Sequence, residues 1–357
     1  MEKFKKSLGF IAMLLGLSLV LTVCVSHKRD LRTEPYVKET FTMGTYVKIT
    51  AYDKGHEKDI VAALAIAKDY DKKTSVNQSG SELDAINEQA GIKPVKVSKS
   101  VYKLLKEAYA YSEKQTGFDM MIGAISSLWH IGFDDARKPS QTEINQALPL
   151  VSYRLIAFDD QKQTVYITKK GAKIDLGAIT KGYVSDQMTD YLKAHGVTTA
   201  IVDLGSSSLS LIGQSHRGEN EPWTIGIKDP NQAVSAQVGF LEVQDESVST
   251  SGIYERFLEV DGKIYPHLLD PKTGYPFDND IQSVTIVSKK GVDGDALSTT
   301  IFSLGTKKGY EFVEQHKNIE AIFVDKDNKV YVSKNLKERF EIDKKSDYQL
   351  GDIADLK

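Results

Sequence analysis

The segment ERFLEVDGKIYPHLLDPKTGYP, from Glu255 to Pro276, gives the clearest indication of the fold. Two short alternating runs, Glu255 to Val260 and Lys263 to His267, flank Asp261 and Gly262, a pair typical of a two-residue hairpin turn. The runs therefore predict two neighbouring antiparallel strands. The string HLLDPKTGYP that ends the segment contains two prolines and a glycine, and this composition predicts a tight, fixed loop after the second strand.

Short segments of the same kind occur on both sides of this hairpin, and helical patterns separate some of them. We expect strands at residues 46–52, 155–158, 164–168, 200–203, 223–227, 239–243 and 281–288, with a further hairpin turning at residues 325–328. We expect helices at residues 57–72, from Ser98 or Ser100 towards Gly117, at residues 179–194 and from Asp295 onward. This mixture indicates an α+β fold with a largely antiparallel sheet and packed helices.

The overall composition is that of a soluble globular protein, with the N-terminus as the exception. Of the 357 residues, 41% are hydrophobic and 27% are charged. The 46 Lys and Arg residues against 49 Asp and Glu residues give a formal net charge of -3. A protein that binds nucleic acid usually has a basic excess that contacts the phosphate backbone. We therefore expect no nucleic acid among the partners.

The first residues have the pattern of a secretory signal. Lysines precede an uncharged, mostly apolar run from Leu8 to Val23, which is shorter than the roughly 20 residues of a membrane-spanning helix. Cys24, the single cysteine of the chain, stands where this run ends, and the string LTVC resembles a bacterial lipobox. Val23 departs from that pattern, because a small residue usually precedes the cysteine. Lipidation of Cys24 is the favoured interpretation, beside an uncleaved anchor and ordinary cleavage.

Each of these three outcomes places the folded part outside the cytoplasm, and lipidation would hold it on the outer face of the cell membrane. Residues 25–36 are polar and charged without periodicity, so we expect a tether. The charged end of the chain predicts a flexible surface tail. The expected organisation is a signal segment at residues 1–24, a tether at 25–36, one folded domain at 37–345 and a tail at 346–357.

His267 stands at the junction between the predicted strand and the tight loop. A rigidly held histidine is suited to proton transfer near neutral pH. The same residues also fit a surface turn without chemistry, in which Asp270 caps the turn and Gly274 supplies a positive φ angle. Both interpretations stay open on these residues alone.

The segment KIDLGAITKG, from Lys173 to Gly182, predicts a short strand, a glycine and the start of a helix. Free N–H groups and the helix dipole at such a start favour a phosphate, and Lys181 adds a positive charge there. Asp175 has an alternative role, because an aspartate before a helix is often its cap. This segment by itself is a weak signal.

In the segment GVDGDALSTTIFSLG, Asp295 and Thr299 are four positions apart and share a face if the stretch is helical. A carboxylate and a hydroxyl, completed by a main-chain carbonyl, water and substrate phosphates, match the ligand preference of Mg²⁺. The alternative is an ordinary helix start, with Asp295 stabilising the dipole and Thr299 in the core.

Together, and in this order, these segments resemble the FAD:protein FMN transferase (ApbE) family, in its exported lipoprotein form. Further matching strings are FTMGTYV at residues 41–47, GSELDAIN at 80–87, the pair Phe118 and Asp119, and STSGIYERF at 249–257. The resemblance covers nearly the whole chain after the signal segment. The order of so many motifs is more specific than any one of them.

The resemblance implies a site and a reaction. The residues against FAD would be Met43, Asp119, Asp175, Lys181 and Leu268. Magnesium would be held by the main-chain oxygen of Ala178 and the side chains of Asp295 and Thr299. His267 would act as general base toward a threonine or serine hydroxyl of an exported or membrane-associated acceptor protein. FMN would be attached through a phosphoester bond and AMP released.

Two positions depart from the family pattern. Ser206 stands where a second glycine is usual, and a side chain there would crowd the flavin or adjust the loop. Pro266 precedes His267 where a small polar residue is more usual, and it should stiffen the end of the strand.

Two other functions share most of these features. A magnesium-dependent FAD pyrophosphatase would use water in place of the acceptor hydroxyl and yield FMN and AMP. A flavin-binding lipoprotein without catalysis would need a pocket but neither a rigid base nor a metal at the pyrophosphate. His267 and the pair Asp295 and Thr299 therefore favour an enzyme over a binding protein.

Overall fold

The computed structural model describes residues 30–76, 79–114, 117–231 and 236–356. The predicted signal segment, Cys24 and the first residues of the predicted tether lie outside these ranges. From Leu31 onward the chain forms one compact unit. None of its helices combines the length and the apolar character that crossing a membrane would require, as far as the described residues go.

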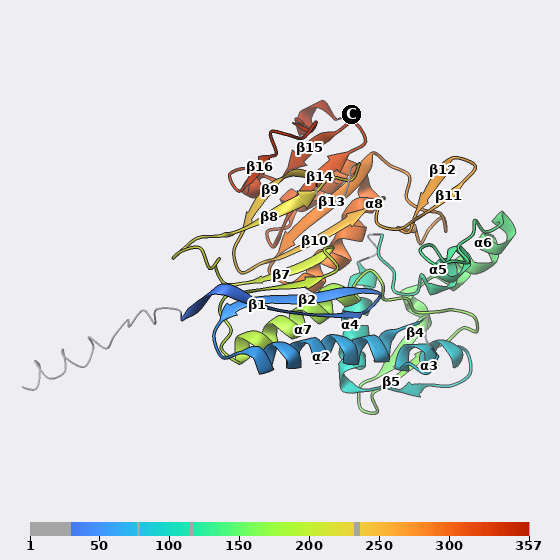
Figure 1. Cartoon of the computed structure of the whole chain (residues 1–357). Helices are drawn as coiled ribbons and strands as arrows, with labels where there is room; N and C mark the ends of the chain where they lie inside the picture. The colour runs from blue at the N-terminus through green and yellow to red at the C-terminus, as the bar shows by residue number, and fades with distance from the viewer. Residues whose placement is uncertain (1–29, 77–78, 115–116, 232–235, 357) are drawn as a thin grey trace, which may run out of the picture. The chain divides into compact units, whose positions relative to one another are not determined.

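The central element is a sheet that has nine strands within the described ranges, in the order β1-β2-β6-β7-β10-β13-β14-β15-β17 (Figure 1). Every neighbouring pair is antiparallel except β15 and β17, which run parallel. This confirms the predicted α+β class with a largely antiparallel sheet. The strands are β1 (Leu31–Thr42), β2 (Thr45–Asp53), β6 (Ala200–Leu204), β7 (Ser208–Ile212), β10 (Ser247–Gly252), β13 (Ile281–Ser288), β14 (Ile319–Asp325), β15 (Lys329–Val332) and β17 (Gln349–Leu350).

Helices cover one face of this sheet. They are α2 (Glu57–Thr74), α7 (Thr180–Ala194) and α8 (Gly291–Gln315); α7 contacts both α2 and α8, and all three contact strands of the sheet (Figure 1). Apolar residues on one side of each helix, such as Leu64, Met188 and Phe302, join one core with Ile49 and Ile286 of the sheet. The periodic apolar positions of the sequence are thus the positions that the helices bury.

A three-stranded antiparallel sheet, in the order β16-β9-β8, packs against residues on the other face of the large sheet. Trp223 and Leu241 meet Leu211, Val248 and Ile322 of the large sheet in a second core. The strands are β8 (Trp223–Lys228), β9 (Gln237–Val243) and β16 (Phe340–Ile342). Strand β13 therefore lies between two layers and is buried along its whole length.

Two smaller assemblies complete the fold. The sheet β3-β5-β4 packs near α3 and α4, and the hairpin of β11 and β12 lies beside α5 and α6 (Figure 1). The helices are α3 (Glu82–Glu88), α4 (Lys99–Glu113), α5 (Gly123–Trp129) and α6 (Gln141–Ala147). The strands are β3 (Val95–Lys96), β4 (Ile156–Asp159), β5 (Thr164–Ile167), β11 (Phe257–Val260) and β12 (Lys263–Pro266). Short 3₁₀ helices are η1 (Leu148–Leu150), η2 (Tyr153–Leu155), η3 (Lys334–Leu336) and η4 (Ile353–Asp355).

The second half of the predicted tether belongs to the folded unit instead. Residues from Leu31 onward form β1, and Tyr36 pairs with Ala51 of β2. An ion pair between Arg32 and Glu57 ties the start of β1 to α2. The prediction of a tether was wrong at these residues. An edge strand that exposes much of its surface needs few apolar residues, so its polar composition resembles that of a tether.

The predicted flexible tail at residues 346–357 is also placed differently. Strand β17 adds to the edge of the large sheet beside β15. Tyr348 is buried, and its hydroxyl donates a hydrogen bond of 2.7 Å to the buried carboxylate of Asp229. One buried tyrosine therefore anchors a segment whose other residues are mostly exposed.

Candidate functional site

His267 lies immediately after β12 and is held by the main-chain carbonyl of Arg256. Its own main-chain N–H donates to that oxygen at 3.0 Å, and its Nδ1 lies 3.2 Å from the same atom. A carbonyl only accepts hydrogen bonds, so Nδ1 carries the proton and Nε2 keeps its lone pair. Burial lowers the pKa of His267 to about 4, although the residue as a whole is partly exposed. The imidazole is therefore neutral at pH 7, with Nε2 able to accept a proton.

The tight loop after His267 forms as the prolines and glycine predicted. The N–H of Gly274 donates to Asp270 O, and the N–H of Asp270 donates to Tyr275 O, both at 2.8 Å. The indole N–H of the buried Trp129 donates to the carbonyl of Gly274 at 2.8 Å. The loop is thus tied to α5 and packed against it, which is more than a surface turn needs.

The exit of the same loop is tied to α8. The side-chain amide of Asn279 donates to Phe302 O at 2.6 Å, and the carboxylate of Asp280 accepts from Thr306 N at 3.1 Å. These bonds meet α8 where its helical geometry is interrupted at Gly305. The loop of His267 and the helix of Asp295 are therefore connected by direct hydrogen bonds.

Helices α7 and α8 meet at Asp295. The carboxylate of Asp295 accepts a hydrogen bond of 2.6 Å from the main-chain N–H of Gly182, in the first turn of α7. A Cβ atom at Gly182 would lie 2.1 Å from Gly291 O and 2.9 Å from Cγ of Asp295. Only glycine permits this approach. The close packing of α7 against α8 therefore explains why the segment KIDLGAITKG ends in a glycine. The helix begins at Gly291, four residues before the predicted start at Asp295.

Two buried hydroxyls lie beside Asp295. Those of Ser208 and Ser249 lower its pKa, and neither has a hydrogen-bond partner other than Asp295 among the described residues. Burial has the larger effect and raises the pKa of Asp295, while the charge of Lys181 lowers it. A desolvated carboxylate with hydroxyl oxygens beside it is an environment that a hard cation would stabilise.

The other two predicted metal ligands lie in the turn before α7 and in α8. Ala178 is exposed in the turn before α7, and Thr299 is buried one helical turn after Asp295. No three His, Cys, Asp or Glu side chains gather as a metal-binding group in the described ranges. A cation here would therefore depend on one carboxylate, hydroxyl and carbonyl oxygens, and oxygens from substrate and water. The residues fit magnesium on those terms.

Lys181, in the first turn of α7, interacts electrostatically with both His267 and Asp295. Its charge lowers the pKa of both groups. Its ammonium group donates to the hydroxyl of Ser207, in the turn between β6 and β7. The neighbouring Ser206 has a left-handed backbone with φ 62°, a conformation that glycine adopts more easily. The serine that replaces the usual glycine at position 206 therefore lies in a strained turn next to the residue that Lys181 contacts.

The five residues that the resemblance assigns to FAD are spread over several segments. Met43 lies in the turn between β1 and β2, and Leu268 is buried directly after His267. Asp175 accepts from Ser126 Oγ at 2.6 Å and from Gly177 N at 2.8 Å, so it closes the turn before α7 but does not cap that helix. Asp119 accepts from Met121 N and Tyr153 N, and burial raises its pKa.

Glu255 is a residue at this site that the sequence did not single out. Its carboxylate reaches solvent, but the surrounding protein desolvates it enough to raise its pKa. Lys181 lowers this pKa and Asp295 raises it, so Glu255 faces the same space. The sequence offered one indication of this role, the position of Glu255 in the motif STSGIYERF. The strands β11 and β12 separate Glu255 from His267.

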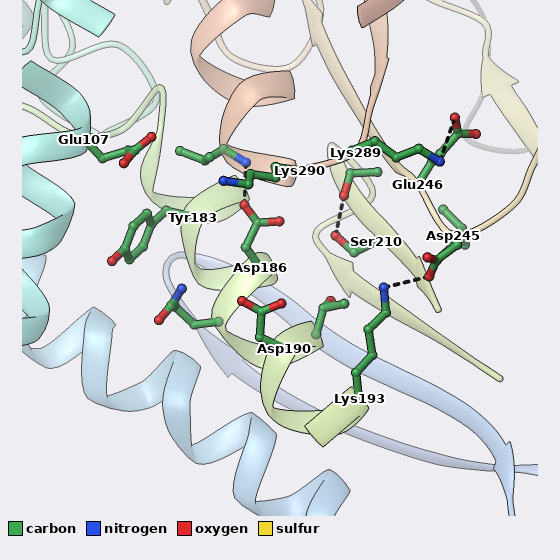
Figure 2. A pocket seen from close by; sticks show the side chains of 15 residues that line it. Glu107, Tyr183, Asp186, Asp190, Lys193, Ser210, Asp245, Glu246, Lys289 and Lys290 are labelled. Atoms are coloured by element: carbon green, nitrogen blue, oxygen red, sulfur yellow. Dashed lines mark hydrogen bonds and ion pairs between the residues drawn. The ribbon is translucent and has the colours of Figure 1, made fainter. Parts of the chain in front are cut away.

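A cavity of about 250 Å³ is lined by residues of α7 from Tyr183 to Lys193 and does not include His267 or Asp295. Figure 2 shows its charged walls, in which Lys193 pairs with Asp245 and Asp186 faces the start of α8. Asp186 accepts from Gly291 N at 2.6 Å and Val292 N at 3.0 Å, and so caps α8. Burial raises its pKa to about 7.

Comparison with known sequences places these features in a family. A sequence model of the ApbE family matches residues 43–323, which is most of the chain. The chain belongs to the ApbE family. The match includes the start of α7, His267 and all of α8, which are the segments that carry Lys181, the proposed base and Asp295.

Individual ApbE relatives are similar over almost their full length. A protein of Klebsiella pneumoniae named FAD:protein FMN transferase is 36% identical over 85% of this chain and 94% of its own length. A protein of the same name from Treponema pallidum is 34% identical over 87% of this chain and 90% of its own.

Solved ApbE structures have the same fold. The crystal structure of the ApbE protein of Thermotoga maritima matches with a TM-score of 0.78 and 31% identity, over 86% of this chain and 99% of that one. The flavin transferase ApbE of Vibrio cholerae matches with a TM-score of 0.74 and 26% identity, over 86% and 99% of the two chains.

Proposed function

We propose that this chain transfers FMN from FAD to a threonine or serine hydroxyl of another protein and releases AMP. The observation that carries the proposal is the neutral His267 in a chain of the ApbE family: its Nε2 has no hydrogen-bond partner among the described residues, and the charge of Lys181 acts on it. The names of the relatives support flavin transfer as the reaction class.

The chain's own residues account for most of the reaction. Nε2 of His267 accepts the proton of the acceptor hydroxyl as its oxygen bonds to the phosphorus on the FMN side. The bond between that phosphorus and the AMP oxygen breaks, and AMP leaves with the bonding electron pair. Lys181, in the first turn of α7, neutralises pyrophosphate oxygens.

Asp295, Thr299 and the carbonyl of Ala178 would hold magnesium beside the pyrophosphate. When bound, the cation would neutralise further negative charge on the phosphate oxygens. The buried carboxylate of Asp295, with the hydroxyls of Ser208 and Ser249 against it, supports a cation at this position.

The experiment uses the chain from Ser26 onward, which retains all of β1, together with FAD, Mg²⁺ and candidate exported proteins. In-gel flavin fluorescence after denaturation and AMP release are measured together. We expect a fluorescent acceptor band with equimolar AMP, and loss of both in Asp295→Asn. Asp190→Asn, which removes an exposed carboxylate from α7, is the matched control and should retain both.

Other outcomes would redirect the assignment. Free FMN and AMP without a labelled protein would indicate FAD hydrolysis, and intact FAD would indicate a flavin-binding protein. Either result with every acceptor tested would contradict the proposed transfer.

We further propose that the enzyme works on the outer face of the cell membrane, anchored through a lipid on Cys24. The apolar run before Cys24 and the lipobox-like LTVC support this location. Labelling of cells with a radioactive fatty acid should mark the wild-type chain and leave Cys24→Ala unmarked. Equal labelling of both, or of neither, would contradict the lipid anchor.

A further inference from the structure

Four buried serines lie on the face of the large sheet that α7 and α8 cover. Ser208 and Ser210 belong to β7, and Ser247 and Ser249 belong to β10. Residues two positions apart in a strand point to the same side of the sheet. The four serines form two directly opposite cross-strand pairs, Ser208 with Ser249 and Ser210 with Ser247. Each of them is at most 3% exposed.

The two pairs satisfy their hydroxyls in different ways. The Oγ atoms of Ser210 and Ser247 lie 2.8 Å apart and form a hydrogen bond with each other. Ser208 and Ser249 have the same cross-strand arrangement, yet their hydroxyls do not bond to each other. Both instead form hydrogen bonds with the carboxylate of Asp295. Such bonds are the stronger choice, because a hydroxyl bonds more tightly to a charged acceptor than to a neutral one.

Close packing between strand and helix holds Ser249 against the segment of Asp295. A Cβ atom at Gly294, the residue before Asp295, would lie 2.7 Å from Oγ and 2.9 Å from Cβ of Ser249. The strand and the helix can approach each other this closely because position 294 is a glycine. Ser208, as the direct cross-strand partner of Ser249, is fixed by the register of the sheet. The two serines therefore meet the carboxylate from fixed positions.

The carboxylate of Asp295 thus has three donors from the protein. Besides the two hydroxyls, it accepts the main-chain N–H of Gly182. An ionised carboxylate offers about four lone-pair positions, so these donors leave one position open. The donors also determine the direction in which that position points before any cation is bound. Groups that orient a metal ligand in this way affect metal affinity when they are removed.

We propose that Ser208 and Ser249 are positioning residues for Asp295, and that they set the affinity of the site for magnesium. This inference rests on the proposed function, because that function places magnesium at Asp295. Neither serine touches the reacting atoms. Both hold the carboxylate in the orientation that meets the cation, so less freedom is lost when the cation binds.

The test compares two double variants of the chain used for flavin transfer. The first combines Ser208→Ala with Ser249→Ala and removes both hydroxyl contacts to Asp295. The control combines Ser210→Ala with Ser247→Ala, which removes two equally buried hydroxyls from the same strands and the same face. The two single variants of the first pair are included, so that the effect can be measured even if the double variant fails to fold.

Cation binding is measured apart from catalysis. The probe is Mn²⁺, a paramagnetic ion that suits the same oxygen ligands as Mg²⁺, and its binding is followed by electron paramagnetic resonance. ADP is present at a fixed concentration, because it carries the adenosine diphosphate part of FAD without the flavin. Samples without protein give the amount of Mn²⁺ that ADP binds by itself. The rate of flavin transfer is then measured over a range of Mg²⁺ concentrations.

We expect the dissociation constant for Mn²⁺ to rise about 10- to 100-fold in the first double variant and to keep its wild-type value in the control. The Mg²⁺ concentration that gives half the maximal transfer rate should rise by a similar factor. The rate at saturating Mg²⁺ should approach that of wild type, because the serines act on cation binding. A general loosening of the sheet would instead lower the maximal rate and would affect the control as well.

Unchanged Mn²⁺ affinity in the first double variant, or an equal loss in both double variants, would overturn the positioning role and leave the proposed transfer standing. If wild type binds Mn²⁺ but labels no acceptor, the proposed transfer fails, and the Mn²⁺ affinities still decide the positioning role. Absence of Mn²⁺ binding to wild type would count against the magnesium site and this inference together.

Discussion

At the scale of single residues, one carbonyl decides the chemistry of His267. The oxygen of Arg256 fixes the imidazole tautomer, and burial keeps the ring neutral. The positive charges of Arg256 and Lys181 act in the same direction and lower the pKa further. A base held in this way loses some strength, but it is in the correct protonation state over a wide pH range.

The pH dependence of flavin transfer should therefore lack the usual histidine transition. Because the pKa of His267 is lowered to about 4, the neutral base persists as the pH falls through 6.5 and is lost only near the lowered value. Initial rates at saturating FAD and acceptor should stay nearly constant down to about pH 5. His267→Asn should lower the rate by about 10²- to 10⁴-fold with FAD binding retained. An acidic limb near pH 6.5 would contradict this account.

At the scale of elements, the arrangement of α7 and α8 depends on two aspartates, one in each helix, which accept hydrogen bonds from the start of the other helix. Asp295 of α8 accepts from the first turn of α7, and Asp186 of α7 accepts from the first turn of α8. Each carboxylate stabilises the free N–H groups at the start of the partner helix. The position of Asp295 in the site is thus a consequence of reciprocal helix capping.

The raised pKa of Asp186 predicts a pH-dependent stability. The folded state keeps the proton up to about pH 7, whereas the unfolded chain loses it near 3.8. Stability from this group is therefore greatest at low pH and falls as the pH rises between these values, by at most about 1.4 kcal/mol per pH unit. Urea unfolding at several pH values should show that decline in wild type and a weaker one in Asp186→Asn. Parallel curves for the two proteins would refute the assignment.

At the scale of the whole molecule, the ends of the described chain close the two edges of the large sheet. Strand β1 forms one edge and β17 the other, so both segments expected to be loose contribute to the fold. The contact of Tyr348 with Asp229 links the C-terminal segment to the region between β8 and β9. The folded unit therefore extends beyond the boundaries 37 and 345 expected from composition.

Removing the hydroxyl of Tyr348 should destabilise the whole protein. In Tyr348→Phe the carboxylate of Asp229, which is 2% exposed, loses a donor. The expected loss is about 1 to 3 kcal/mol of unfolding free energy, measured by chemical denaturation. Tyr166→Phe, at a partly exposed strand position, is the control and should change the free energy little. Equal effects of the two substitutions would contradict an anchoring role for Tyr348.

Features set by neighbouring residues were predictable from the sequence. The turn at Asp261 and Gly262, the helix that Ser98 caps and the apolar face of α2 all formed as expected, because turn geometry, capping and periodicity act over a few residues. The motif segments at His267, Lys181 and Asp295 were also recognisable. Strand β10 was missed, since its sequence SVSTSG is polar and has the composition of a loop.

Only the tertiary structure decided how these segments act together. Strand β10 is buried because β7 and β13 satisfy its backbone on both sides, which places Ser249 under Asp295. The contact of Gly182 with Asp295 joins residues 113 positions apart. The sequence by itself determined the local elements and the residue types available for the chemistry. Their proximity came from long-range packing, which no local pattern encodes.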